Sequence, residues 1–302
     1  MTDRRLMLVH AHPDDETSST AATMADAMAT GGQVTLVTCT LGERGSVVLP
    51  ELLHLHHEQD DGLGPHRLGE LAAAMGALGV TDFVRLGGDG RWSDSGMVDT
   101  DEGLATVGDD VPENAFWNAD LLEAATELVA LIRDRRPQVL ITYDEKGGYG
   151  HPDHVQAHRV AMYATALAGA LTFRPDLGAA WTIQRVLWTA IPASAMRMMI
   201  AGARAAGEEF FAGFDLESDA IPPMCVADEY IAVKVDGSAY RRQRFAALRA
   251  HRTQIPADSF FFWGEHEESG VAVFAAESFT LAAGSAPPPG ATDVFAGLLP
   301  EG

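Results

Sequence analysis

The chain alternates between short apolar runs and longer segments with helical periodicity, and this alternation restricts the fold more than any other feature. The apolar runs predict strands, and the segments between them end at glycine or before proline, as helices do. Predicted strands cover residues 6–10, 33–40, 83–86 and 138–143, and predicted helices cover residues 18–30, 67–78, 118–135 and 155–170. Repeated units of this kind predict an α/β fold with a doubly wound, mostly parallel sheet. Ligands of such sheets bind beyond the carboxyl ends of the strands, where the strand order reverses.

The pattern weakens after residue 180. Strands are predicted at residues 181–191 and 230–235, a basic helix at residues 240–251, and a loop at residues 286–291. We therefore predict a catalytic core over residues 1–180 and an additional C-terminal α/β region over residues 181–302. The second region is expected to complete the substrate pocket and to form one compact unit with the first.

Charge and composition exclude several classes of partner. The 302 residues include 43 acidic and 21 basic side chains, a formal charge of −22 that repels nucleic acid and anionic membrane surfaces. No apolar run is long enough to span a bilayer, and the apolar stretch within the first ten residues is too short for a signal peptide. Cys39 and Cys225 are isolated, as is usual in a reducing compartment. We therefore expect a cytoplasmic protein.

Two similar motifs, HPDD at residues 12–15 and HPDH at residues 151–154, each stand between a predicted strand and a predicted helix. Residues i and i+3 near a helix start project the same way, so His12 converges with Asp15, and His151 with His154. Two imidazoles and a carboxylate bind a divalent ion, and a neighbouring carboxylate serves as base to a water molecule. The alternative is that each motif only caps a helix. Two copies at two strand ends favour the metal site.

The motifs resemble those of the LmbE-like (PIG-L-type) metal-dependent N-deacetylases, a family with a Rossmann-like fold that usually uses zinc. The segments HRLGEL (66–71), LGGDGRWSDSGM (86–97) and TYDEKGGYGHPDHV (142–155) resemble its mycothiol-biosynthesis branch in particular. The resemblance is clear over residues 5–165 and thin beyond residue 190. It implies a hydrolase that removes acetate from a small-molecule substrate, N-acetylglucosaminyl-inositol.

Carried over position by position, the resemblance makes His12, Asp15 and His154 the ligands of one divalent ion per chain. The family favours Zn²⁺, although such a ligand set also suits Fe²⁺. Asp14 would be the general base, and His151 would hold the oxyanion and protonate the leaving amine.

Other positions would support the chemistry or contact the substrate. Asp153 would orient an imidazole through a hydrogen bond, and the Tyr149 phenol would reach the carbonyl oxygen. The positions that resemble contacts to the sugar and the inositol are Arg67, Asp94, Ser19 and Met97.

Two other functions stay open at this point. A mycothiol-conjugate amidase would share the metal site and the base, and a sugar-binding protein that had lost catalysis would not need Asp14. A further cluster, His54, His56 and His57 with acidic neighbours, lacks the strand-end placement and is expected to be a surface loop or lid. Nothing in the sequence indicates the oligomeric state.

Overall fold

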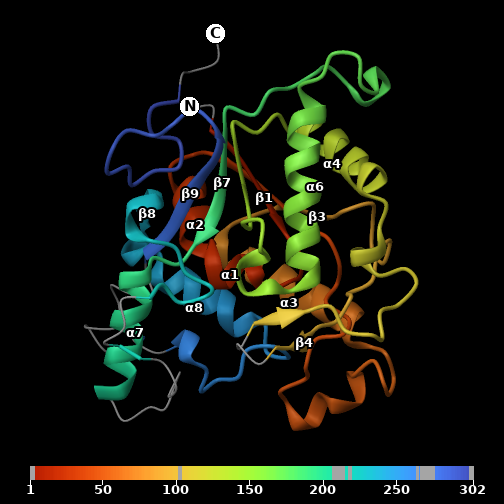
Figure 1. Cartoon of the computed structure of the whole chain (residues 1–302). Coiled ribbons are helices and arrows are strands. Elements are labelled where there is room, and N and C mark those ends of the chain that lie inside the picture. Colours follow the sequence, from red (N-terminus) through yellow and green to blue (C-terminus); the bar gives the residue numbers. More distant parts are fainter. Residues whose placement is uncertain are drawn as a thin grey trace.

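The computed structural model describes residues 4–100, 104–205, 215–216, 220–262, 265 and 276–298. Within these residues the main sheet has seven strands, with helices packed on both of its faces (Figure 1). In their order across the sheet, the strands are β3 (Asp82–Arg85), β2 (Gln33–Thr38), β1 (Arg5–His10), β6 (Val139–Thr142), β7 (Arg185–Ala190), β9 (Ala276–Gly284) and β8 (Ile231–Asp236). A small separate sheet pairs β4 (Val98–Asp99) with β5 (Ala105–Thr106).

The helices alternate with the strands along the chain. They are α1 (Asp15–Ser19), α2 (Ala21–Ala29), α3 (Leu63–Leu78), α4 (Leu121–Arg135), α5 (Gly147–Gly150), α6 (Pro152–Ala168), α7 (Ala193–Ala205) and α8 (Arg241–Ala250). Short 3₁₀ turns lie at Pro50–Leu55, Phe116–Asn118, Pro175–Leu177, Asp228–Tyr230, Ser238–Tyr240 and Phe260–Phe262. No helix in the described ranges combines the length and the apolar character needed to cross a membrane.

The strand order reverses beside β1. Strands β3, β2, β1, β6 and β7 are parallel, and the chain fills one side of β1 before it crosses over to β6 on the other side. Strand β9 is antiparallel to both β7 and β8. The predicted doubly wound, mostly parallel α/β fold is confirmed, and the carboxyl ends of β1 and β6 form the edge where a ligand is expected.

Alternate side chains of the central strand β1 pack into two hydrophobic cores, one on each face of the sheet. Leu6 and Leu8 of β1 belong to the core that includes residues of α2, α3 and α8, whereas Met7 and Val9 belong to the core of α4 and α6. All four side chains are buried. Because successive side chains of a strand point to opposite faces, the apolar run that predicted this strand is buried on both sides.

The segment predicted as one helix over residues 18–30 is two helices. Helix α1 begins at Asp15, and the backbone turns at Thr20 (φ −142°, ψ 8°) before α2 continues. The Thr20 hydroxyl donates a hydrogen bond to the Glu16 carbonyl at 2.9 Å and lies 3.1 Å from Nε2 of the buried His10. The Thr20 N–H still donates to the Glu16 carbonyl and the Met24 N–H to the Thr20 carbonyl, so the backbone changes direction here while these hydrogen bonds continue.

Two elements of the C-terminal part escaped the sequence prediction. Helix α7 carries buried side chains at helical spacing, namely Met196, Ile200 and Ala203, so its signal was present in the sequence. Strand β9, AESFTLAAG, has small residues at both ends and does not show clear alternation. It forms by pairing with β7 and β8, which are distant in sequence.

Candidate active site

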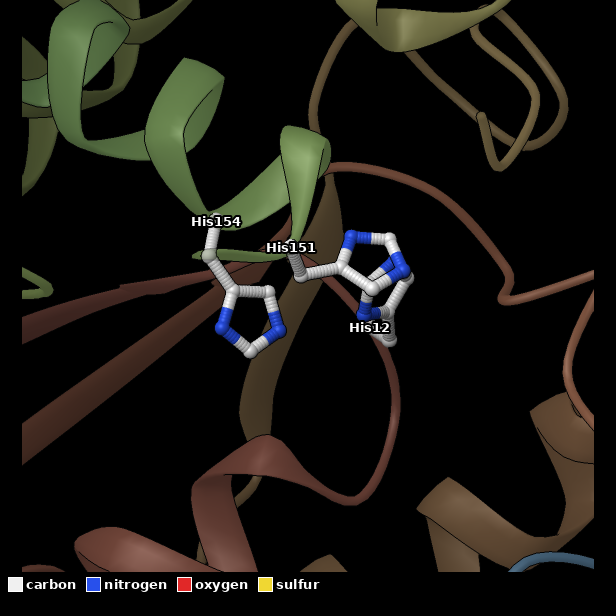
Figure 2. Close-up of side chains that lie close together, drawn as sticks. All are labelled: His12, His151 and His154. Atoms are coloured by element: carbon white, nitrogen blue, oxygen red, sulfur yellow. The ribbon is translucent and has the colours of Figure 1, made fainter. Parts of the chain in front are cut away.

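The two HPD motifs lie at the ends of neighbouring strands. His12 follows β1, whereas His151 and His154 open α6 after β6, the strand that pairs directly with β1. The three imidazoles gather where these segments meet (Figure 2). The ring centroid of His12 is 4.6 Å from that of His151 and 5.4 Å from that of His154, and the last two centroids are 5.1 Å apart. The predicted convergence of the two motifs is therefore observed.

Helix capping explains only part of the two motifs. His151 does cap α6, because its Nδ1 accepts a hydrogen bond from the Asp153 N–H at 3.1 Å and Pro152 follows in the first turn. Asp14 precedes α1 but makes no capping bond with its side chain. Capping does not explain why the other motif residues face one another in a buried cluster.

Asp15 lies between two imidazole nitrogens. Its Oδ2 is 3.4 Å from Nδ1 of His12, and its Oδ1 is 3.2 Å from Nε2 of His154. The second nitrogen of each ring lies near an acceptor, at 3.1 Å from Asp153 Oδ2 for His12 and at 3.2 Å from the Gly147 carbonyl for His154. Burial lowers the pKa of His12, but Asp94, Asp15 and Asp153 raise it more, so without an ion the charged ring is favoured. A ring that gives up this proton and keeps its hydrogen on the second nitrogen has the first nitrogen available to a cation.

Two imidazole nitrogens and an ionised carboxylate that lie this close are ligand types that suit a cation. Nε2 of His154 is buried and has no hydrogen-bond partner within the described part of the chain. Burial raises the pKa of Asp15, but the imidazoles of His154 and His12 lower it more, so the carboxylate stays ionised. The three residues therefore have the nitrogen and oxygen ligand types that a divalent ion takes in proteins.

Two groups of ligand atoms in the cluster lie close enough to share one ion, and neither includes Asp15. In the described residues, His12, His151 and His154 have ligand atoms within 4.8 Å of one another, as do His12, Asp94, His151 and Asp153. All of these side chains are buried. The structure thus supports a metal centre at this strand edge and offers more than one way of sharing its ligands.

Gly147 packs closely against His154 in a backbone conformation that residues with a Cβ rarely adopt. Gly147 has a φ of +68°, and a Cβ at this position would lie 2.8 Å from the Cβ of His154 and 2.7 Å from the Val155 nitrogen. Only glycine allows this close approach, which brings the Gly147 carbonyl to the ring of His154. The Tyr143 ring stacks on the same imidazole with centroids 4.2 Å apart. Together these contacts fix the ring.

Asp14 lies beside this set, with a positive φ of 109°. Its Oδ2 accepts a hydrogen bond at 2.9 Å from Nη2 of Arg67, which is 2% exposed and also donates to the Gly42 and Pro13 carbonyls. Burial raises the pKa of Asp14 to about 6, although the charge of Arg67 opposes the rise. A carboxylate with this pKa is ionised at neutral pH and still accepts protons readily.

Comparison with known proteins identifies the group of proteins to which this site belongs. A family model described as PIG-L, GlcNAc-PI de-N-acetylase, matches residues 7–165. A Kribbella flavida protein named 1D-myo-inositol 2-acetamido-2-deoxy-alpha-D-glucopyranoside deacetylase is 50% identical over 99% of both chains. A protein of the same name from a Nocardioides species is 51% identical over 98% of this chain and 99% of its own.

The chain belongs to the PIG-L family. Its fold is also similar to that of N,N'-diacetylchitobiose deacetylase from Pyrococcus horikoshii, with a TM-score of 0.60 over 92% of this chain and 84% of the other. The two sequences are 16% identical. The predicted family membership is confirmed.

Asp153 of this PIG-L protein is completely buried and connects two segments of the site. It accepts hydrogen bonds from the Ser95 backbone N–H at 2.9 Å and from the Ser95 hydroxyl, as well as from Nε2 of His12. Asp94 is 3% exposed, and its Oδ1 accepts from the Gly96 N–H at 2.8 Å and lies 3.8 Å from Nε2 of His12. The loop around Ser95 therefore orients the imidazole of His12.

His151 and Tyr149 flank the cluster on the α5 side. Burial and the imidazoles of His12 and His154 lower the pKa of His151 to about 2, so the neutral ring is favoured. Tyr149 is 36% exposed, and its ring lies 5.0 Å from that of His154 and 6.2 Å from that of His151. Burial raises its pKa, so its phenol stays protonated.

Two predicted substrate contacts and the predicted histidine loop of this PIG-L protein remain to be placed. The Ser19 hydroxyl donates to the Asp15 carbonyl at 2.7 Å, and Met97 is 46% exposed. His54, His56 and His57 lie at and just after the 3₁₀ turn Pro50–Leu55, and they belong to neither group of possible metal ligands found in the described residues.

Sequence reasoning missed two partners of the site. Ser95 stands in the segment that carries the family resemblance, so its neighbourhood was indicated but its bond to Asp153 was not. His251 lies at the end of α8 and bonds to Glu16 of α1. No local signal links residues that are 235 positions apart.

Proposed function

We propose that this protein removes acetate from 1D-myo-inositol 2-acetamido-2-deoxy-alpha-D-glucopyranoside, the substrate in its relatives' names, and that this reaction serves mycothiol biosynthesis. The observation that carries the proposal is Asp15 between the facing nitrogens of His12 and His154, with Asp14 alongside. Relatives about half identical over nearly the whole chain support the substrate. The formal charge of −22 supports a small neutral substrate over nucleic acid, and we place the reaction in the cytoplasm.

We propose that His12, Asp15 and His154 hold one divalent ion, zinc or ferrous iron. When bound, the ion would supply Lewis-acid activation of water and of the acetamide carbonyl. Asp153 and the Gly147 carbonyl keep the two rings in the required tautomers through the hydrogen bonds described above.

Asp14 is the proposed general base. It follows Pro13 and precedes Asp15 in the motif, the charge of Asp15 acts on its carboxylate, and Arg67 fixes one carboxylate oxygen at 2.9 Å. With a pKa near 6, it accepts a proton from the attacking water at neutral pH.

His151 and Tyr149 are the proposed donors to the carbonyl oxygen as it gains negative charge. Because Nδ1 of His151 accepts the Asp153 N–H, the hydrogen of the neutral ring lies on Nε2 and is free to be donated. The resemblance also gives this ring the task of protonating the leaving amine. That task requires the charged imidazolium, which the low pKa disfavours. A pH profile of a His151 variant separates the two tasks.

The proposed substrate contacts differ in how exposed they are. Met97 is open to solvent, whereas Arg67 and Asp94 are buried and already hydrogen-bonded within the protein. A sugar hydroxyl that binds Arg67 or Asp94 would have to share their existing hydrogen bonds, and Ser19 is a further proposed contact. The exposed Met97 is therefore the position at which a substitution should change KM alone.

The test is a direct comparison of two amides. Metal-loaded protein is incubated separately with the acetylated glucosaminyl-inositol and with a mycothiol thioether conjugate, and free amine is measured over time. The proposal expects a kcat/KM at least about tenfold higher for the acetylated sugar. A preference for the thioether conjugate would instead make the protein an S-conjugate amidase, and no release from either would leave a sugar-binding protein.

A further inference from the structure

A buried ion pair joins the C-terminal part of the chain to the start of α1. Nε2 of His251, the residue directly after α8, lies 2.8 Å from Oε1 of Glu16, and both side chains are 0% exposed. Nδ1 of His251 has no hydrogen-bond partner among the residues that the structure describes. Burying such a pair is unfavourable unless its geometry is good, so stability alone is a weak reason for its presence.

The second oxygen of the same carboxylate holds the proposed base. Oε2 of Glu16 accepts a hydrogen bond at 2.8 Å from the backbone N–H of Asp14. Asp14 has a φ of 109° and a ψ of −29°, a conformation that is unfavourable for a residue with a Cβ and persists only where its surroundings enforce it. Glu16 is thus one of the groups that enforce it.

The Asp14 carbonyl accepts hydrogen bonds from the N–H groups of Thr17 and Ser18 in α1, and two further contacts hold its N–H and its carboxylate. Its backbone is held by Glu16, and its carboxylate is held by Nη2 of Arg67 at 2.9 Å. Without its partner, Glu16 would lose the contact that fixes the other oxygen of its carboxylate. The partner is His251, which fixes Oε1 and thereby aims Oε2 at the Asp14 amide.

We propose that His251 is a positioning residue, which acts through Glu16 to hold Asp14 in its strained conformation and its carboxylate at the reacting atoms. The proposal rests on the assignment of Asp14 as general base in the proposed function. It gives the C-terminal part of the chain a specific task in catalysis, since α8 delivers this residue to the strand edge where the two motifs meet. A shift of about an ångström in a catalytic group is enough to lower a rate by roughly a hundredfold.

The test compares three substitutions at His251 with a matched control. In His251→Gln the amide nitrogen can occupy the place of Nε2, whereas His251→Asn places its nitrogen nearer that of Nδ1, and His251→Ala has neither. Thr253 serves as the control because it is equally buried, two residues away, and its N–H and hydroxyl bond to the buried Glu70 at 2.8 and 2.7 Å. Thr253→Val removes a buried hydrogen bond in the same segment without touching Glu16.

The proposal expects His251→Ala and His251→Asn to lose about 10- to 100-fold in kcat, with KM within about twofold and metal content unchanged. His251→Gln should recover most of the loss, and Thr253→Val should keep kcat within about threefold while its melting temperature falls. Amide exchange followed by NMR gives a readout independent of turnover. The Asp14 N–H should exchange faster in His251→Ala than in the wild type or in Thr253→Val.

Equal kcat values for the glutamine and asparagine variants, or an unchanged Asp14 amide, would overturn the proposal. If the alanine variant does not fold, the glutamine and asparagine pair still decides the question. Asp14→Asn separates this inference from the proposed function. If Asp14→Asn keeps normal turnover, the assignment of the base is wrong, whereas inactive Asp14→Asn together with fully active His251→Ala refutes only the positioning role.

Discussion

Replacing Asp14 with asparagine should strongly lower activity and at the same time stabilise the metal-free protein. Asparagine has the size of the protonated aspartate, and its Oδ1 can still accept the hydrogen bond from Arg67. It cannot take a proton from water, so turnover should fall about a hundredfold or more, as is usual for general bases. Stability should change in the opposite direction, because the folded protein disfavours the charged form of Asp14.

The size of the stabilisation follows from the pKa. Folding raises the pKa of Asp14 from 3.8 to about 6, so the folded protein binds this proton more tightly than the unfolded chain does. Stability therefore falls as pH rises from about 4 to about 6, and the loss remains at higher pH. One pKa unit corresponds to about 1.4 kcal/mol, so the ionised carboxylate destabilises the fold by about 3 kcal/mol at pH 7.

Urea unfolding of the EDTA-treated protein measures this difference. Asp14→Asn should be more stable than the wild type by about 3 kcal/mol at pH 7, and the two should become equal below about pH 4. The control Asp60→Asn removes an exposed carboxylate and should change stability by less than about 0.5 kcal/mol at either pH. A less stable Asp14→Asn protein at pH 7 would show that Arg67 outweighs burial, and the argument for a raised pKa would fail.

Other substitutions in the cluster have separable outcomes. His154→Ala should lose the single divalent ion in elemental analysis, and full metal occupancy in that variant would remove His154 from the ligand set. His151→Ala should keep the metal and lose about a hundredfold or more in turnover, with the high-pH limb of its profile unmoved; a flattened limb would instead assign it the protonation of the amine. Asp153→Asn should lower metal affinity or turnover by about 10- to 100-fold, because the His12 ring loses the acceptor that fixes its tautomer.

The sequence predicted the central fold well because its signals are local. Apolar runs buried on both faces marked β1, β2 and β6, and glycine or proline marked the ends of their helices. Strand β9 could not be found in this way, because it is defined by antiparallel partners far along the chain. Helix α7 was missed although its apolar spacing was visible in Met196 and Ile200.

In the candidate site, too, the residues with local sequence signals were predicted and those that depend on long-range contacts were not. His12, Asp15, His151 and His154 stand in two repeated motifs at strand ends, so their convergence was predictable from the sequence. The hydrogen bonds that support these residues were not predictable, because they join residues far apart in the sequence. The bond from His251 to Glu16 and the one from Ser95 to Asp153 are set by how α8 and the loop after β3 fold back onto the sheet edge.

The central claim is that the site at the carboxyl ends of β1 and β6 catalyses metal-dependent deacetylation, and it has one direct test. Acetate and free amine are quantified together from 1D-myo-inositol 2-acetamido-2-deoxy-alpha-D-glucopyranoside, for chelator-treated protein before and after one equivalent of Zn²⁺ or Fe²⁺. We predict equimolar acetate and amine, at a rate that one equivalent of metal restores in the wild type but not in Asp14→Asn. Equal rates with and without metal, or a fully active Asp14→Asn protein, would contradict the assignment of the site.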